Sequence, residues 1–130
     1  MKIVEVAVGV IKQGDDIYIS KRADDLHQGG KWEFPGGKRE ADETIEQALS
    51  RELSEEIGIQ VTKQTPFMII EHDYGDKKVR LDVRLVDGFE GTASHQEGQV
   101  SLWANINALS DFTFPEANKQ IITKLMQTYL

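Results

Sequence analysis

The amino-acid sequence predicts an α/β fold of the α+β kind, in which a mixed β-sheet lies sandwiched between helices in three layers (α/β/α). Three observations lead to this prediction: an alternating apolar segment at residues 3–11, an amphipathic helix with clear ends at residues 44–58, and a second amphipathic helix at residues 115–129. Strands combined with two main helices bury their apolar surfaces when the helices cover the sheet. We expect the 130 residues to form a single domain with its own core.

The first predicted strand spans residues 3–11. Its even-numbered positions, from Val4 to Val10, are all valine, and this β-branched face is expected to point into the core. The other face is small at Ala7 and Gly9, and our hypothesis is that a flat ligand lies there. Residues 14–16 predict a turn into a second strand at residues 17–22.

The next predicted element is a helix that follows a glycine-rich loop. Thr44 and Gln47 have the spacing of a capping box, and Gly58 fits the left-handed position after the last turn. Apolar residues recur at near-helical spacing and predict a buried stripe, made of Ile45, Leu49, Leu53 and Ile57.

The remaining predicted elements begin with a hairpin. Residues 67–74 and 79–86 are expected to pair around Gly75-Asp76, and in the second arm Arg80, Asp82 and Arg84 alternate with apolar residues. A short strand is predicted at residues 100–104. The final helix, residues 115–129, has Thr113 and Glu116 as a predicted capping box.

Composition excludes several classes of function. The chain has no cysteine, which excludes disulfides, thiolate zinc sites and cysteine nucleophiles. A net charge of −7 argues against stable nucleic-acid binding, because that requires a basic surface. No apolar run approaches the ~20 residues of a membrane span. We therefore expect a cytoplasmic protein with no membrane attachment, and a monomer.

An acidic cluster lies in the last two turns of the predicted helix. Glu52, Glu55 and Glu56 are spaced i, i+3 and i+4, so they lie on one helix face. Each like-charged pair destabilises a bare helix by roughly 0.2–0.5 kcal/mol, and the helix dipole disfavours anions near the C-terminus. A bound hard divalent ion, Mg²⁺ or Mn²⁺, would remove both penalties. The alternative is an ordinary acidic surface helix.

The same segment resembles the Nudix box, G-x5-E-x7-R-E-U-x-E-E-x-G-U, where U is aliphatic. Every fixed position of the box is matched, by Gly37, Glu43, Arg51, Glu52, Leu53, Glu55, Glu56, Gly58 and Ile59. The resemblance implies a Nudix fold over residues 1–130 and hydrolysis of a nucleoside diphosphate linked to another group. It also implies that Glu52, Glu55 and Glu56 bind the metal.

Segments outside the box are similar to the MutT branch of this family. They read A-V-G-V-I, K-R-A-D-D-L-H, E-F-P-G-G-K, H-Q-E-G-Q and F-P-E-A-N. The branch hydrolyses oxidised guanine nucleoside triphosphates, chiefly 8-oxo-dGTP, to the monophosphate and pyrophosphate, which prevents mutation during DNA replication. The resemblance thus implies a nucleoside triphosphate substrate and a Mg²⁺ or Mn²⁺ cofactor.

The resemblance assigns roles to individual residues. Glu52 is a metal ligand and a candidate general base, although spacing alone leaves open which carboxylate is the base; Arg51 holds a carboxylate in place. Glu97 is a further metal-binding glutamate that takes part in catalysis, and Gly36 lies close to the metal or phosphate. The residues implied to bind the nucleotide are Arg22, His27, Glu33, Phe34, Pro35, Gly36 and Asn118.

Three alternatives remain open at this point. One is a Nudix enzyme for another nucleotide, such as CTP, another pyrimidine triphosphate, a dinucleotide or ADP-ribose. The second is a non-catalytic nucleotide-binding module on the same fold, and the third is a structural protein that binds only a cation. His72 and His95 match no motif and are interpreted as surface residues.

Overall fold

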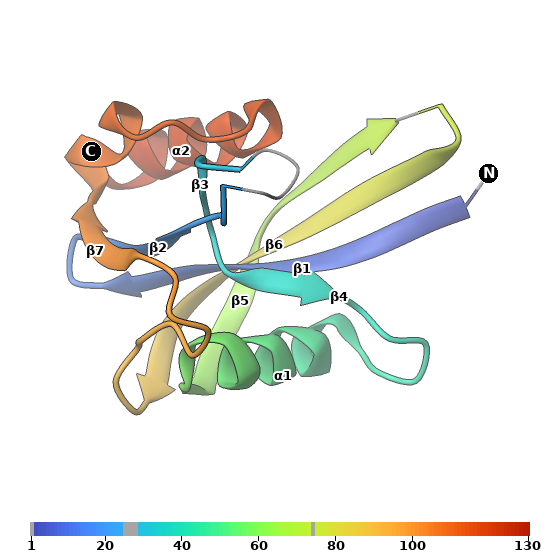
Figure 1. Ribbon diagram of the computed structural model, residues 1–130, viewed down its shortest axis with the longest axis horizontal. Coiled ribbons are helices and arrows are strands. Elements are labelled where there is room, and N and C mark those ends of the chain that lie inside the picture. Colours follow the sequence, from blue (N-terminus) through green and yellow to red (C-terminus); the bar gives the residue numbers. More distant parts are fainter. Residues whose placement is uncertain (1, 25–28, 74) are drawn as a thin grey trace.

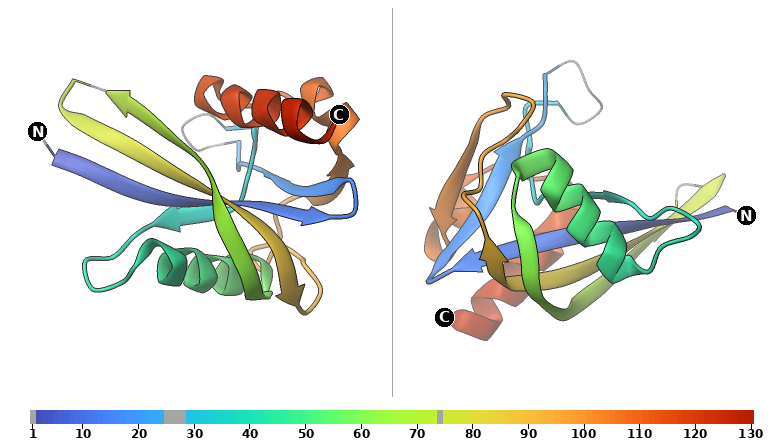
Figure 2. Two further views of the ribbon diagram at one scale, coloured as in Figure 1. Left: turned by 180° about the vertical axis from the view of Figure 1, so that it is seen from behind. Right: turned by 90° about the horizontal axis from the view of Figure 1, so that it is seen from below.

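The computed structural model describes residues 2–24, 29–73 and 75–130 of the chain. A mixed sheet forms the middle layer, helix α1 (Ile45–Ile57) covers one of its faces, and helix α2 (Glu116–Tyr129) covers the other (Figure 1). Views from behind and from below show the same three layers (Figure 2). The predicted sandwich of helices around a mixed sheet is therefore confirmed.

In the described part of the chain seven strands make up the sheet, and a short 3-10 helix, η1 (Ile106–Asp111), precedes α2. In chain order the strands are β1 (Lys2–Gln13), β2 (Asp16–Lys21), β3 (Trp32–Glu33), β4 (Gly36–Lys38), β5 (Gln60–Asp73), β6 (Lys77–Glu90) and β7 (Ser101–Asn105).

Strand β1 joins the two parts of the sheet. It runs parallel to β6 along residues 2–11, and β6 pairs with β5 in the long antiparallel hairpin. The other edge of β1 pairs antiparallel with β4 at residues 6–8 and with β2 at its C-terminal end. Strand β2 also pairs with β3 and β7. Because both edges of β1 are paired, the segments bound to them are held in fixed register to each other.

Helix α1 begins and ends where the sequence predicts. The Gln47 backbone N–H donates to the Thr44 hydroxyl at 3.1 Å, and the Thr44 N–H donates to the Gln47 side chain at 2.8 Å, which confirms the capping box. Gly58 ends the helix with a left-handed φ of 70°. The predicted apolar stripe is fully buried except at Ile45.

Helix α2 starts without the predicted capping box. Its N-cap is Pro115, and no side chain caps it. Thr113 is instead part of an extended segment, because its carbonyl accepts the Trp32 N–H at 2.8 Å. Pro115 favours an extended residue before it and has a φ of −57°, so the helix begins only after the proline.

The small residues of β1 accommodate a helix. Ala7 is fully buried in the cluster beneath α1. A Cβ added to Gly9 would lie 3.2 Å from Cδ1 of Leu53 and 3.3 Å from Cδ1 of Leu49. The absent side chain therefore lets α1 approach the strand closely. The hypothesis that a flat ligand lies on this face is wrong, since α1 occupies it.

Two strands and the 3-10 helix were missed by the sequence analysis, and β5 begins earlier than predicted. Strands β3 and β4 have only two and three residues, so they show no alternation. Pro66 lies inside β5, which a proline tolerates because β5 is an edge strand with a register shift beside it. No helix in the described ranges is long and apolar enough to cross a bilayer.

Candidate active site

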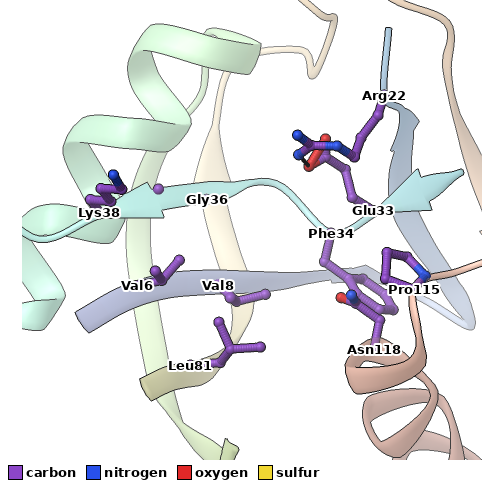
Figure 3. A pocket seen from close by; sticks show the side chains of 11 residues that line it. Val6, Val8, Arg22, Glu33, Phe34, Gly36, Lys38, Leu81, Pro115 and Asn118 are labelled. Atoms are coloured by element: carbon purple, nitrogen blue, oxygen red, sulfur yellow. Dashed lines mark hydrogen bonds and ion pairs between the residues drawn. The ribbon is translucent and has the colours of Figure 1, made fainter. Parts of the chain in front are cut away.

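A cavity of about 360 Å³ opens between β1, β4, β6 and the start of α2 (Figure 3). Val6, Val8 and Leu81 form an apolar wall, because the parallel register places Val6 beside Leu81. Phe34 and Asn118 lie at one end. The volume is in the range of small-molecule sites.

The end of the cavity beside α2 combines an aromatic ring with an amide. Phe34 is buried and stacks on Phe114, with ring centroids 5.1 Å apart and planes 20° from parallel. Asn118 lies in the first turn of α2, where its backbone N–H donates to the Pro115 carbonyl at 3.0 Å. Its side-chain amide offers a donor and an acceptor beside an apolar surface, which suits the edge of a flat heterocycle.

An ion pair lies on the rim of the cavity. Arg22, the residue after β2, and Glu33 of β3 point toward each other, with Nη1 and Oε1 3.1 Å apart (Figure 3). Burial raises the pKa of Glu33 above its ordinary value of 4.5, although the charge and hydrogen bond of Arg22 lower it. Glu33 also lies close enough to Glu56 to raise the pKa of that carboxyl.

The carboxyls of Glu52 and Glu56 are neighbours on α1. Burial and the adjacent charge of Glu52 raise the pKa of Glu56 to about 8, while a hydrogen bond from the Gly36 backbone N–H opposes that rise. Oε2 of Glu56 is buried and finds no hydrogen-bond partner in the described part of the chain. An unpartnered carboxylate oxygen beside a second carboxyl is the arrangement that a cation stabilises.

Arg51 fixes the position of one of these carboxyls. Its Nη1 donates to Oε1 of Glu52 at 2.8 Å, and its Nη2 donates to the Lys38 carbonyl at 3.1 Å. The same guanidinium binds Glu43 through two hydrogen bonds, at 2.7 and 3.1 Å. This pairing lowers the pKa of Glu43 to about 2 and raises the pKa of Arg51.

Strand β4 brings its glycines against the acidic face of α1. A Cβ added to Gly37 would lie 2.7 Å from Oε1 of Glu52, and closer still to Oε2 and Cδ. Real Cβ atoms essentially never approach within 3.0 Å of a heavy atom. Gly37 is therefore required for the position that Glu52 occupies.

A loop spanning residues 94–98 docks on the last turn of α1. The Ser94 N–H donates to the Ile57 carbonyl at 3.1 Å, and the Gln96 N–H donates to the Glu56 carbonyl at 2.7 Å. Carbonyls at a helix end lack partners within the helix, so the loop satisfies two of them. Glu97 lies on this loop with its side chain exposed.

The structure brings only some of the predicted site residues together. Arg22, Glu33, Phe34, Gly36 and Asn118 line the cavity. Glu52 and Glu56 lie together on the adjacent face of α1.

Of the other predicted site residues, Glu55 and Pro35 do not line the cavity. Glu55 is 61% exposed, with Oε2 3.5 Å from Arg51. Pro35 is buried behind the cavity wall, where its carbonyl accepts the Gly9 N–H at 2.8 Å. His27 lies outside the described residues. Among the residues described, no three acidic or histidine side chains converge as a ready-made cation site.

A comparison with protein families gives the assignment. The NUDIX domain family model matches residues 6–124. The chain belongs to the Nudix family.

Its Nudix relatives include enzymes with different substrates. The chain is 41% identical to the 8-oxo-dGTP diphosphatase of Escherichia coli K12, over 96% of this chain and 98% of that protein. It is 31% identical to the CTP pyrophosphohydrolase of the same organism, over 97% of this chain and 93% of that protein. A solved MutT structure, from work on the proteins of Aliivibrio salmonicida and Vibrio cholerae, superposes with a TM-score of 0.89 at 39% identity, covering 98% of this chain and all of that one.

The Nudix site contains residues that sequence reasoning left without a role. Glu43 matched the box but had no assigned partner, and it proves to be the main anchor of Arg51. His95, interpreted as a surface residue, accepts the Glu97 backbone N–H on Nδ1 at 3.2 Å and lies close enough to Glu33 to lower its pKa. Lys38 lines the cavity. Only Glu43 carried a sequence signal, its place in the box.

Proposed function

We propose that this protein hydrolyses 8-oxo-dGTP to 8-oxo-dGMP and pyrophosphate, and so removes an oxidised nucleotide before it enters DNA. One observation carries the proposal: a cavity with an aromatic and amide end continues, through Gly36 and Gly37, to the carboxyls of α1. A nucleotide requires both features side by side, because its base binds an aromatic ring and an amide while its phosphates bind a cation held by carboxyls. Four 8-oxo-dGTP diphosphatases that are 34–43% identical to the chain support the choice of substrate.

The residues present fit a divalent cation, Mg²⁺ or Mn²⁺. The buried, unpartnered Oε2 of Glu56 and the neighbouring carboxyl of Glu52 would hold it, with the Gly36 backbone close by. Glu55 and Glu97 are the further ligands in this proposal; both are exposed at the edge of the same region. When bound, the ion supplies charge neutralisation for the phosphates and a more acidic water.

The chain's own residues orient the reaction. Arg51 holds Oε1 of Glu52 at 2.8 Å, which leaves Oε2 to take a proton from the attacking water. Arg22, on the cavity rim, would bind substrate phosphate in competition with Glu33. Phe34 and Asn118 would hold the base, so the phosphate chain extends toward α1.

A second candidate is hydrolysis of CTP. The CTP pyrophosphohydrolase of Escherichia coli is 31% identical to the chain over nearly its full length. The higher identity to the 8-oxo-dGTP diphosphatase favours the oxidised purine.

Steady-state rates on 8-oxo-dGTP, dGTP, CTP and ADP-ribose test the proposal. We expect kcat/KM to be highest for 8-oxo-dGTP, and a higher value for CTP would refute the choice. Asn118→Ala should lower kcat/KM for 8-oxo-dGTP by roughly 10-fold or more, because each lost hydrogen bond to the base costs about 1–3 kcal/mol. Thr123→Ala, on the same helix but away from the cavity, is the matched control.

The oligomeric state and the location of the protein are part of the proposal. We propose a single-domain monomer that acts in the cytoplasm on free nucleotides, without stable nucleic-acid binding. The net charge of −7 supports the last point, because bound cations screen a free triphosphate but do not replace a basic groove. Sedimentation of the purified chain at micromolar concentration would reveal a dimer.

A further inference from the structure

Arg84 is a buried charge that lies outside the site. Among the residues that the structure describes it is the only charged residue that is buried, with 6% of its surface exposed. It extends from β6 toward α1 and pairs in register with Gly9 of β1, where a Cβ would lie 3.2 Å from Cδ1 of Leu53 on the helix. An arginine in such a place requires partners for its charge and its donors.

The partners of Arg84 connect two strands to the start of α1. Its Nε donates to Oε1 of Gln64 on β5 at 2.7 Å, and its Nη2 lies 3.2 Å from Oε1 of Glu46 in the first turn of the helix. The amide nitrogen of Gln64 then donates to the Glu46 carbonyl at 3.2 Å and to the Ser50 hydroxyl at 3.3 Å. Asp82, 3.8 Å from Nη1, adds a second negative charge.

These hydrogen bonds supply directional contact where the helix otherwise packs through apolar side chains. Apolar packing is non-directional, so it resists separation of helix and sheet more than it fixes rotation or sliding of the helix. Hydrogen bonds weaken steeply when their angle changes. Arg84 and Gln64 therefore fix the first two turns of α1, and Arg51, also in the second turn, ties the helix to β4 through the Lys38 carbonyl.

The acidic residues of α1 tolerate little displacement. Glu52 comes six residues after Glu46, about 9 Å along the helix axis, and the two residues move together as parts of one helix. The contact between Gly37 and the Glu52 carboxyl leaves no room for a single methyl group. A shift of about 1 Å at this point can reduce catalysis by two orders of magnitude.

We propose that Arg84, acting through Gln64 and Glu46, is a positioning residue that sets where α1 presents Glu52 and Glu56 to β4. Its effect on turnover rests on the proposed function, whereas its effect on cation binding can be measured without nucleotide. The role is separable from stability, because kcat and Mn²⁺ affinity are measured per folded molecule. Removing Arg84 alone leaves Asp82 and Gln64 without this partner, so a lower Tm is expected in addition.

The test compares Arg84→Met with Arg80→Met. Both variants remove one positive charge from the same face of β6, but no hydrogen bond or ion pair joins Arg80 to α1, a helix described in full. We expect Arg84→Met to lower the Tm, to lose roughly 10-fold in kcat per folded molecule with KM changed less than about 3-fold, and to bind Mn²⁺ roughly 10-fold more weakly. Arg80→Met should match the wild type in all of these.

Two further variants keep the result decisive. Arg84→Lys keeps the charge but loses the fork to Gln64 and Glu46, so it should recover only part of kcat. Gln64→Met removes the link between Arg84 and α1 without changing the charge, and it should weaken Mn²⁺ binding as Arg84→Met does. If Arg84→Met fails to fold, the Mn²⁺ affinity of Gln64→Met tests the positioning role.

The outcomes separate the two proposals. Wild-type Mn²⁺ affinity and kcat in Arg84→Met and Gln64→Met would overturn the positioning role, as would a fall in Tm with unchanged kcat per folded molecule. Mn²⁺ binding is measured by electron paramagnetic resonance in the absence of nucleotide. Failure of the wild type to hydrolyse 8-oxo-dGTP would refute the proposed function. The Mn²⁺ affinities would still test whether Arg84 positions α1.

Discussion

Replacing Gly37 with alanine tests whether the position of Glu52 controls turnover. The added methyl carbon would lie 2.7 Å from Oε1 of Glu52 and nearer to Oε2 and Cδ, whereas ordinary van der Waals contact begins at 3.4 Å. The carboxyl must therefore retreat by roughly 1 Å. A displacement of that size at a reacting group can cost about 10²-fold in rate, or about 2.7 kcal/mol of transition-state stabilisation.

The assay is pyrophosphate release from 8-oxo-dGTP at saturating Mg²⁺. We expect Gly37→Ala to lower kcat/KM by roughly 10²-fold. Gly14→Ala is the control: it adds a methyl group where nothing lies within 4 Å, at a left-handed φ of 60°. That change should cost about 1–2 kcal/mol of stability through backbone strain and leave kcat/KM unchanged.

A double-mutant cycle identifies the collision as the cause. Glu52→Asp shortens the side chain by one methylene group, so it makes room for the new methyl group of Gly37→Ala. If steric displacement is responsible, the two substitutions should be strongly non-additive. Additive losses, or a Gly37→Ala variant within about threefold of the wild type, would refute the reasoning.

Three more expectations concern the charged groups. Glu52→Gln should lower turnover by at least roughly 10²-fold with only a modest change in nucleotide affinity measured by calorimetry; unchanged turnover would reject Glu52 as the base. Arg51→Lys keeps the charge but loses the forked contacts to Glu43 and Glu52, so kcat should fall roughly 10-fold and the Tm should drop; wild-type kinetics would show that charge alone suffices. Without divalent ions, the pKa of Glu56 in the folded state is raised to about 8 from its ordinary value of 4.5, so between these pH values the folded state binds more protons than the unfolded state. The free energy of unfolding should therefore fall as pH rises from about 4.5 to about 8. Urea midpoints of Glu56→Gln should lack that slope, and an equal slope in the variant would contradict the assignment.

Helix α1 was predictable because its signals are local. Thr44, Gln47 and Gly58 make their contacts within a few residues, so spacing alone located both ends of the helix. The α/β/α layering followed from the same periodicity. The capping box predicted for α2 failed because Thr113 pairs with Trp32, more than eighty residues earlier in the chain.

The rest of the site depends on contacts between distant segments. Strand β4 exists because Gly36 and Gly37 pair with Val8 and Ala7, which no pattern within a three-residue strand can reveal. Arg84 alternates with apolar neighbours as a solvent-facing residue does. Its burial follows from the position of α1 over that end of β6, and alternation gives no information about which helix covers a face.

The pairing of β1 on both edges has a consequence for how the molecule opens. Val6 and Val8 lie in the apolar wall of the cavity, and the same segment of β1 pairs with β4, whose Gly37 contacts Glu52 on the acidic helix. Separating β4 from β1 would expose both regions in one event, so local fluctuations cannot release the base pocket alone. The Gly9 and Arg39 amide hydrogens donate across this pair to the Pro35 and Glu5 carbonyls. They should therefore exchange with deuterium as one cooperative unit, and a nucleotide bound at either end should slow both together.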